Sequence, residues 1–308
     1  MGNLPAYIDC VFRSCECNPD INWLILTDDR TPRRLPSNVC VKYATMDEFQ
    51  ETFSRKLDFE VKIPNPYHFC VFRPAYGFLF ADLLVGYDFW GHCDLDVIYG
   101  DLRAFLGEEI LSSYNKVLNR GHLTLYRNNP EVNRYFMLKA PNVIDYRGAI
   151  RDPRTRQFEE WRGMNPILRY HDIPQYHAEF IVDVRIPTRW KYTRFEGTEI
   201  PNYPNQVFYW YKGRIFQAYR NGEGGTIDHE YAYIHLQQRP LPTPGFDPYT
   251  TDGFLITPDG FFPYAREFFT EADYQKYNRA RFRPARELMR MACRSLRWRL
   301  ARIFHTPV

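Results

Sequence analysis

Two aspartates stand one residue apart directly after an apolar, aromatic segment. Residues 87–93 read YDFWGHC and predict a central strand, and Asp94 and Asp96 follow it. Positions i and i+2 of an extended backbone face the same way, so the two carboxylates would repel each other without a cation between them. Mg²⁺ and Mn²⁺ prefer such oxygen ligands together with substrate phosphates. The pattern therefore predicts a site for Mn²⁺ or Mg²⁺.

The same spacing also has a purely structural interpretation. About one Asp-x-Asp is expected by chance in a chain of this length and composition, and a solvated turn after a strand would explain it. The aromatic strand before the pair and the Gly100-Asp101 turn after it favour a functional site. Both interpretations stay open on the sequence alone.

The elements that would position these residues alternate between strands and helices. Thr45 and Glu48 have the spacing of a capping box, so a helix begins there. Strands are predicted over 22–27, 38–43, 87–93, 116–119 and 122–127, and helices over 45–55, 75–85 and 130–138. This alternation predicts an α/β fold with a mostly parallel sheet flanked by helices, where ligands bind at the carboxyl ends of strands.

The second half of the chain has a weaker pattern. Residues 206–211 and 214–218 predict a hairpin, residues 231–236 a strand, and residues 240–265 an extended wrap rich in Pro, Gly and aromatic residues. We predict three parts: a nucleotide-sugar-binding catalytic domain over 1–240, the wrap over 241–278, and a basic helical tail over 279–308.

Five segments resemble a known family. They read LPAYIDCVFRSCECNPDINWLILTDD, FRPAYGFLFADLLVGYDFWGHCDLDVIYGDL, GHLTLYRN, FEEWRG and YIHLQQRPL, and they span roughly residues 4–240 in the family's order. The chain resembles the bacterial capsular-polysaccharide type of glycosyltransferase, with a GT-A-like, Rossmann-like fold. The resemblance implies transfer of a sugar from a nucleotide-sugar donor, first of all a UDP-sugar, to a saccharide or lipid-linked glycan acceptor in cell-surface polysaccharide synthesis.

The resemblance implies a role for each matching position. Asp94, Asp96 and His235 would hold Mn²⁺ or Mg²⁺ against the donor diphosphate, and Glu160, with Glu159 as second choice, would accept the proton of the acceptor hydroxyl. The implied donor-binding residues are Thr27, Asp28, Asp29, Arg73, Asp82, Gly121, His122 and Arg239. Each also has a structural alternative, such as a turn, a solvated side chain or a core histidine.

The sequence departs from the family's pattern in three places. Arg73 stands where the family more often has Lys, and Glu159-Glu160 stand where it has an Asp-Glu pair. Only three residues precede Leu4, where the family has a strand that supplies the first nucleotide-contacting loop. A missing strand would weaken the nucleotide site, which keeps a non-catalytic glycan- or nucleotide-binding relative open as an alternative. A metal-dependent phosphohydrolase that uses Asp94 and Asp96 is a further alternative.

Charge is unevenly distributed along the chain. Residues 279–308 carry nine Arg and one Glu, so a net charge of +3 divides into +8 for this tail and −5 for the rest. Apolar residues between 284 and 304 fall near one helical stripe, which is typical of a helix in an anionic membrane interface. Packing on the body or an oligomer contact would also explain the stripe. The acidic body argues against nucleic acid as a partner.

No apolar stretch is long enough to span a membrane, and the first residues lack the pattern of a secretion signal. The seven Cys are odd in number and form no CxxC pair, which favours reduced thiols. We therefore expect a cytoplasmic protein, peripheral on the inner face of the plasma membrane.

Overall fold

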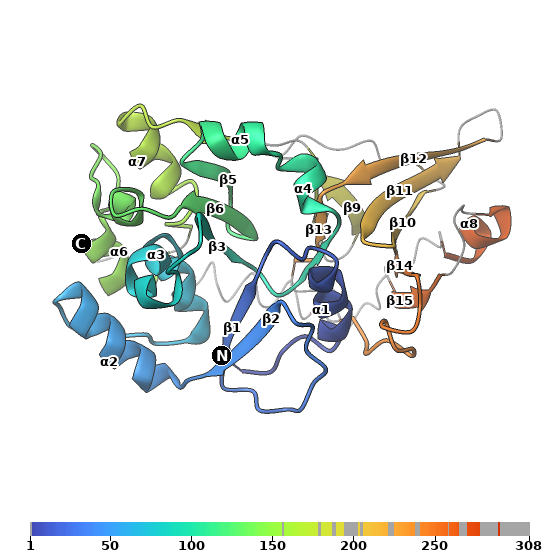
Figure 1. Cartoon of the computed structure of the whole chain (residues 1–308), viewed down its shortest axis with the longest axis horizontal. Coiled ribbons are helices and arrows are strands. Elements are labelled where there is room, and N and C mark those ends of the chain that lie inside the picture. Colours follow the sequence, from blue (N-terminus) through green and yellow to red (C-terminus); the bar gives the residue numbers. More distant parts are fainter. Residues whose placement is uncertain are drawn as a thin grey trace.

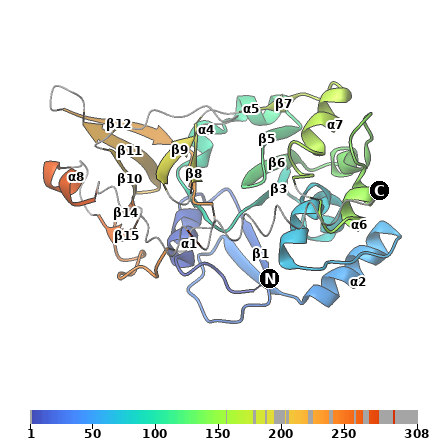
Figure 2. The same ribbon diagram turned by 180° about the vertical axis from the view of Figure 1, so that it is seen from behind.

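The computed structural model of the chain describes residues 2–155, 157–177, 180–186, 189–193, 203, 206–220, 225–237, 241–257, 259–264, 270–277 and 289. The predicted tail helix over 284–304 and the predicted donor contact Arg239 lie outside these residues, apart from Met289. Figures 1 and 2 show helices gathered around one group of strands, and a separate antiparallel sheet at the opposite end of the molecule.

The chain opens with helix α1 (Ile8–Glu16) and a pair of parallel strands, β1 (Trp23–Thr27) and β2 (Val39–Tyr43). Helix α2 (Met46–Leu57) follows, and its start is confirmed. The Thr45 side chain accepts from the Glu48 amide while the Glu48 side chain accepts from the Thr45 amide. This reciprocal capping satisfies two amides that would otherwise be unpaired at the helix start.

The helix predicted over 75–85 is only partly right. The structure has 3₁₀-helix η1 (Pro66–Ala75), one α-helical turn, α3 (Tyr76–Leu79), and 3₁₀-helix η2 (Ala81–Leu83). Pro74 has no amide proton for a continuous α-helix, and Gly86 leaves the region with a left-handed φ of +87°. The helix predicted over 130–138 is likewise the 3₁₀-helix η3 (Val132–Met137).

The aromatic strand of the sequence lies in a four-stranded sheet of order β3-β6-β5-β7. Its strands are β3 (Phe89–Cys93), β6 (Leu123–Arg127), β5 (Lys116–Arg120) and β7 (Gln175–Tyr176). The strand predicted over 87–93 is confirmed for 89–93, but its predicted central place was wrong, because β3 forms the edge of this sheet. The two strands predicted around Arg120-Gly121 are confirmed as the antiparallel pair β5 and β6.

A second four-stranded sheet has the order β4-β13-β8-β9. It contains β4 (Val97–Tyr99), β13 (Tyr233–His235), β8 (Ile181–Ile186) and β9 (Arg189–Thr193). Strand β13 pairs antiparallel with β4 and parallel with β8. The chain therefore passes from the first sheet into the second between β3 and β4, where the two aspartates stand.

The third sheet is antiparallel throughout, with the order β12-β11-β10-β14-β15. Its strands are β12 (Thr226–Tyr231), β11 (Arg214–Arg220), β10 (Gln206–Tyr211), β14 (Gly253–Thr257) and β15 (Gly260–Pro263). The hairpin predicted over 206–218 is confirmed. The extended wrap predicted over 240–265 is wrong for 253–263, which form a hairpin that joins this sheet.

The fold is α/β as predicted. The described strands do not form the single, mostly parallel sheet that was predicted. Three of the eleven strand pairings among the described residues are parallel, namely β1 with β2, β13 with β8 and β5 with β7. Short turns join β5 to β6, β10 to β11 and β14 to β15, and a short turn permits only antiparallel pairing.

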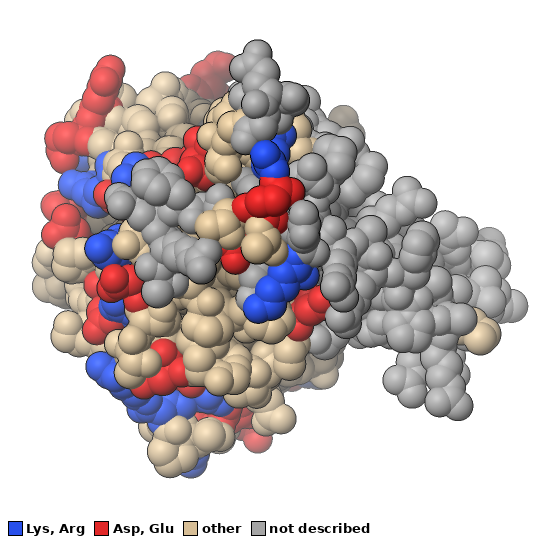
Figure 3. Space-filling view, turned by 90° about the vertical axis from the view of Figure 1, so that its right-hand side faces the viewer, with Lys and Arg blue, Asp and Glu red and all other residues tan. Residues whose placement is uncertain are grey.

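Five further helices complete the described structure: α4 (Leu102–Phe105), α5 (Glu108–Ser113), α6 (Tyr146–Arg151), α7 (Met164–Tyr170) and α8 (Glu271–Tyr277). Among the helices of the described residues, none has the length and apolar character needed to cross a membrane. On the face in Figure 3, acidic and basic side chains are interspersed among uncharged ones.

Candidate metal centre and donor cavity

The turn from Asp94 to Asp96 joins β3 to β4 and is held from two sides. The Asp94 amide donates to the carbonyl of His122 at 3.2 Å, in the turn between β5 and β6. The Leu236 amide donates to the carbonyl of Asp96 at 2.9 Å, directly after β13. Both aspartates are therefore fixed to segments that lie far away in the sequence.

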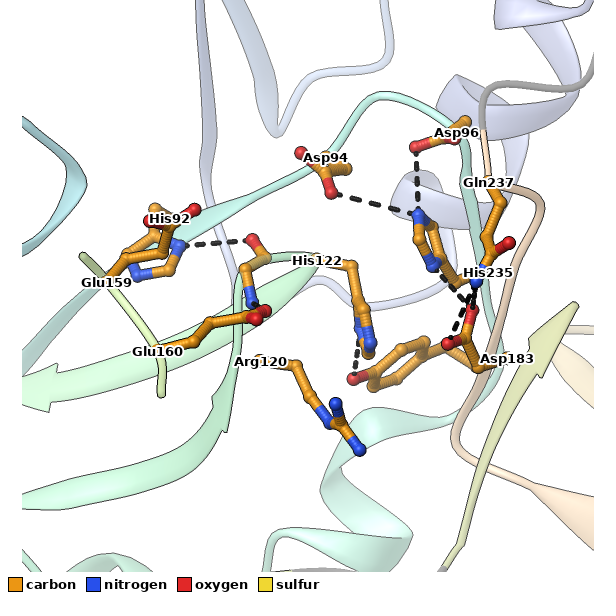
Figure 4. A network of polar contacts seen from close by, with 12 residues as sticks. His92, Asp94, Asp96, Arg120, His122, Glu159, Glu160, Asp183, His235 and Gln237 are labelled. Atoms are coloured by element: carbon orange, nitrogen blue, oxygen red, sulfur yellow. Dashed lines mark hydrogen bonds and ion pairs between the residues drawn. The ribbon is translucent and has the colours of Figure 1, made fainter. Parts of the chain in front are cut away.

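His235, the last residue of β13, meets the two aspartates. Its Nε2 lies 3.7 Å from an Asp94 oxygen and 3.5 Å from an Asp96 oxygen. One ligand atom from each of the three side chains lies within 4.8 Å of the others, and Figure 4 shows them facing one another. Two carboxylates and an imidazole form a donor set that suits Mn²⁺. The structure thus brings together the three residues predicted as metal ligands.

Asp183 orients the imidazole of His235. The Nδ1–H of His235 donates to Asp183 at 2.8 Å, and Gln237 Nε2 donates to the same carboxylate at 3.1 and 3.2 Å. This leaves Nε2 directed at Asp94 and Asp96, as a carboxylate partner does for many metal-binding histidines. Burial alone would lower the pKa of His235, but Asp183 and Asp96 outweigh burial and raise it to about 10.

A second group of metal-ligating side chains, His122, Asp183 and His235, also lies within 4.8 Å. The rings of His122 and His235 are stacked, with centroids 4.5 Å apart and planes inclined by 26°. A metal ion lies near the plane of each ring that binds it, so two stacked rings cannot share one ion. His122 instead lies 2.9 Å from the Tyr233 hydroxyl through Nδ1, and burial, followed by the charge of His235, lowers its pKa.

Arg73 links the aspartates to the acidic pair. Its guanidinium forms a close ion pair with Asp94, donates to the carbonyl of Gly121 at 3.0 Å, and lies 3.6 Å from a Glu159 oxygen. The side chain is mostly buried between these partners. Arg73 therefore balances negative charge that the two carboxylates would otherwise leave uncompensated.

A cavity of about 700 Å³ opens beside the aspartates. Arg73, Asp94 and Asp96 line one part of it, and Leu26 at the end of β1 lines another. The rest of the lining is mostly apolar and includes five aromatic side chains, Tyr7, Phe49, Phe69, Tyr76 and Phe80. A volume of this size, lined by both charged groups and flat rings, fits a molecule that has both a phosphate and an aromatic part.

Glu159 and Glu160 lie on the other side of Arg73. Glu160 is half-buried and accepts a close hydrogen bond from the Gly121 amide. Glu159 is buried, which raises its pKa to about 7 despite the opposing charge of Arg73. One Glu159 oxygen, Oε2, has no hydrogen-bond partner among the described residues.

Gly121 is tightly enclosed by these side chains. A Cβ at this position would lie 2.8 Å from Arg73 Nη1, 3.1 Å from a Glu160 oxygen and 3.3 Å from a Glu159 oxygen. Gly121 and His122 were predicted to contact the donor, and neither of them lines the cavity. Their turn touches Arg73, the acidic pair and the two metal-binding segments.

Four predicted donor contacts have other partners. The Thr27 hydroxyl accepts from the Asp29 amide, and Asp28 accepts from the Gly2 amide at 2.7 Å. Asp29 accepts from Thr31 and Leu4, and these hydrogen bonds lower its pKa to about 2. The exposed Asp82 pairs with Lys56 at 2.8 Å. None of the four aspartate and threonine side chains lines the cavity in the described part of the chain.

Sequence reasoning missed Asp183 and the cavity's aromatic wall. Asp183 is the one acidic residue of the otherwise apolar run IVDV, and a carboxylate in a buried strand needs a partner. This lone carboxylate in an apolar strand could have identified Asp183 as a candidate from the sequence. The rings of the wall come from four separate segments, and nothing in their spacing indicates that they meet. Tyr209 and Trp210 of β10 are buried in the core and do not line the cavity.

No curated protein and no solved structure matches this chain. A family model described as a family of unknown function, DUF6625, matches residues 1–265. Because this match covers most of the chain, the protein belongs to the family of unknown function DUF6625.

Proposed function

We propose that the protein is a metal-dependent glycosyltransferase that transfers a sugar from a nucleotide-sugar donor to a saccharide or lipid-linked acceptor. A UDP-sugar is the first choice of donor. The convergence of Asp94, Asp96 and His235 beside the cavity carries the proposal. Mn²⁺ and Mg²⁺ are commonly held by one or two carboxylates together with substrate phosphates, and a nucleoside diphosphate supplies those phosphates. The resemblance to capsular-polysaccharide glycosyltransferases supports the same reaction.

The cavity would hold the nucleoside part of the donor. Phe49, Phe69, Tyr76 and Phe80 offer flat apolar surfaces to a base, while Arg73 stands at the end where the diphosphate would reach the aspartates. Arg73 has donors for a bidentate contact with phosphate. When bound, the cation supplies positive charge that stabilises the departing diphosphate.

Glu160 is the better placed of the two acidic residues to accept the acceptor's proton. It is half-buried, whereas Glu159 is almost fully enclosed and paired with Arg73. A general base must reach the hydroxyl that it deprotonates. Glu159 then serves mainly to hold Arg73.

A GT-A-like architecture and a role in cell-surface polysaccharide synthesis belong to the same proposal. The parallel pair β1 and β2 ends at the cavity through Leu26, and the aspartates follow a strand end. Both features suit a nucleotide-binding α/β fold. Attachment to an anionic membrane through residues 284–304 would bring the enzyme to a lipid-linked acceptor.

Release of nucleoside diphosphate from a panel of nucleotide sugars with Mn²⁺ tests the proposal. We expect at least one donor to be hydrolysed or transferred, and Asp94→Asn and Asp96→Asn to lose the activity because each removes a ligand charge. Asp88→Asn is the matched control, since Asp88 is exposed just before β3. If none of the nucleotide sugars binds in the presence of metal, the proposal is rejected.

The assay also separates the two alternatives. A phosphohydrolase would cleave simple phosphate esters as fast as nucleotide sugars and would not respond to a saccharide acceptor. A non-catalytic relative would bind a nucleotide sugar with Mn²⁺ and release no diphosphate.

A further inference from the structure

The turn between β5 and β6 touches every part of the candidate site. The Gly121 carbonyl accepts from Arg73 at 3.0 Å and from His92 Nδ1 at 3.2 Å, and its amide donates to Glu160. The His122 carbonyl accepts from the Asp94 amide, and the His122 ring stacks on His235. A displacement of this turn would therefore move the metal ligands and the acidic pair together (Figure 4).

The turn is reached through an irregular piece of backbone. Leu118 has a φ of +65°, in the left-handed region that leucine seldom adopts, and its side chain is buried. The register between β5 and β6 shifts between Val117 and Arg120. Such a conformation persists only where surrounding contacts hold it.

Lys116 makes those contacts from inside the protein. Its side chain is fully buried, and Nζ donates to the carbonyl of Leu118 at 3.0 Å, to Asn165 Oδ1 at 3.1 Å and to Gln175 Oε1 at 3.2 Å. When Lys116 is protonated, its ammonium group has three protons to donate, and each has an acceptor. One of these three hydrogen bonds goes directly to the left-handed residue.

Asn165, in α7, extends the same network to the acidic pair. Its amide donates to the carbonyl of Glu160 at 2.9 Å, and its side-chain Nδ2 donates to the carbonyl of Asn119 at 3.3 Å. One residue thus joins Lys116, the start of the β5–β6 turn and the backbone of Glu160. It is itself buried.

We propose that Lys116 and Asn165 are positioning residues, which hold the β5–β6 turn in register with Glu160 and with the metal-binding side chains. The inference rests on the proposed function, because it concerns the same site. Loss of either residue would leave Asp94, Asp96 and His235 in place in the sequence but would loosen the turn that aligns them.

Binding of Mn²⁺ alone tests this role, with the free ion followed by electron paramagnetic resonance. We expect Lys116→Met and Asn165→Ala to weaken Mn²⁺ binding about tenfold, as the loss of groups that orient metal ligands does. Asn38→Ala is the matched control. Asn38 is also buried, and its side-chain amide donates to three backbone carbonyls, but it lies directly before β2 and none of these carbonyls belongs to the Asp94–Asp96 turn.

Each outcome decides the question. Unchanged Mn²⁺ affinity in the folded variants would overturn the positioning role and leave the metal site standing, as would an equal loss in Asn38→Ala. A wild type that binds no Mn²⁺ would overturn the metal site and the positioning role with it. If Lys116→Met or Asn165→Ala does not fold, Asn165→Ser, which replaces the side-chain amide with a smaller hydroxyl that can still form a hydrogen bond, is judged by the same measurement.

Discussion

Glu159 and Glu160 are neighbours in the chain, but their carboxylates meet different surroundings. Glu159 is enclosed beside Arg73, and burial raises its pKa to about 7. Glu160 is half-buried and accepts from the Gly121 amide. A single turn thus presents one carboxylate to the interior and the other to the edge of the site, and this difference decides which of them can meet an acceptor.

Glu160→Gln should lower the rate of sugar transfer by about 100-fold or more, the usual contribution of a general base. Glutamine keeps an oxygen that can accept the Gly121 amide, so the turn should stay in place. The measurement is the rate of transfer to a saccharide acceptor at saturating donor, with Mn²⁺ and nucleotide binding measured in parallel. We expect binding to be unchanged.

Glu159→Gln is the comparison for this prediction. It removes the negative charge beside Arg73 and therefore should alter donor binding more than the rate of transfer. A larger loss of transfer rate in Glu159→Gln than in Glu160→Gln would assign the base to Glu159 instead.

At the scale of elements, strands and caps were predictable where the local pattern decided them. The runs 22–27 and 38–43 are β1 and β2, and the Thr45–Glu48 pair begins α2. Pairing direction was not predictable, because it depends on which distant strand lies alongside. Strand β13 is a short apolar run whose neighbours, β4 and β8, are known only once the chain has folded.

Some residues of the candidate site could likewise be identified from the sequence, and others could not. Asp94 and Asp96 were identifiable from their spacing after a strand, and His235 only through the resemblance to a family. Lys116 and Asn165 were not identifiable, since a buried lysine with amide and carbonyl partners leaves no pattern in the sequence. Their partners meet only through the bulge in β5.

Gly121→Ala should disturb the β5–β6 turn directly. The added Cβ would lie 2.8 Å from Arg73 Nη1 and 3.1 Å from a Glu160 oxygen, and the Arg73 side chain is held by Asp94 and Glu159. We expect a loss of about 1–3 kcal/mol in the free energy of unfolding, typical of overpacking. Denaturant unfolding measures it.

Gly245→Ala provides the control for that variant, because a Cβ at this exposed position would meet nothing within 4 Å. Its free energy of unfolding should stay within about 0.5 kcal/mol of the wild type. If Gly121→Ala and the wild type have the same free energy of unfolding, the side chains around the turn can adjust to the added Cβ.

At the scale of the whole molecule, the site lies between two hydrophobic clusters. Trp90 of β3 packs in the cluster that contains α2, η1 and α7, whereas Val97 of β4 packs in the cluster that contains α1 and β13. The Asp94–Asp96 turn is where the chain crosses from one cluster to the other. His235 contacts both aspartates of this turn, and the buried Lys116 lies in β5. These two side chains titrate in opposite ways.

Lys116 and His235 should contribute opposite slopes to the stability of the metal-free protein between pH 7 and 9. Burial lowers the pKa of Lys116 to about 7, so above that pH the unfolded chain binds more protons there and this contribution to the free energy of unfolding rises. His235 acts oppositely, because its folded pKa of about 10 keeps a proton that the unfolded chain has lost. Each contributes a slope of at most about 1.4 kcal/mol per pH unit. Other groups titrate in the same range, such as the buried thiols of Cys10 and Cys15, whose pKa burial raises, so each contribution is measured as a difference from the wild type.

Two variants separate these contributions. Relative to the wild type, Lys116→Met should show a free energy of unfolding that falls more steeply as pH rises from 7 to 9, because the rising contribution of Lys116 is removed. His235→Gln should show the reverse, a slope more positive than that of the wild type over the same range. Urea unfolding at half-unit steps of pH, with a chelator present, measures both slopes. Parallel curves for the wild type and both variants would mean that neither side chain titrates in the way its surroundings dictate.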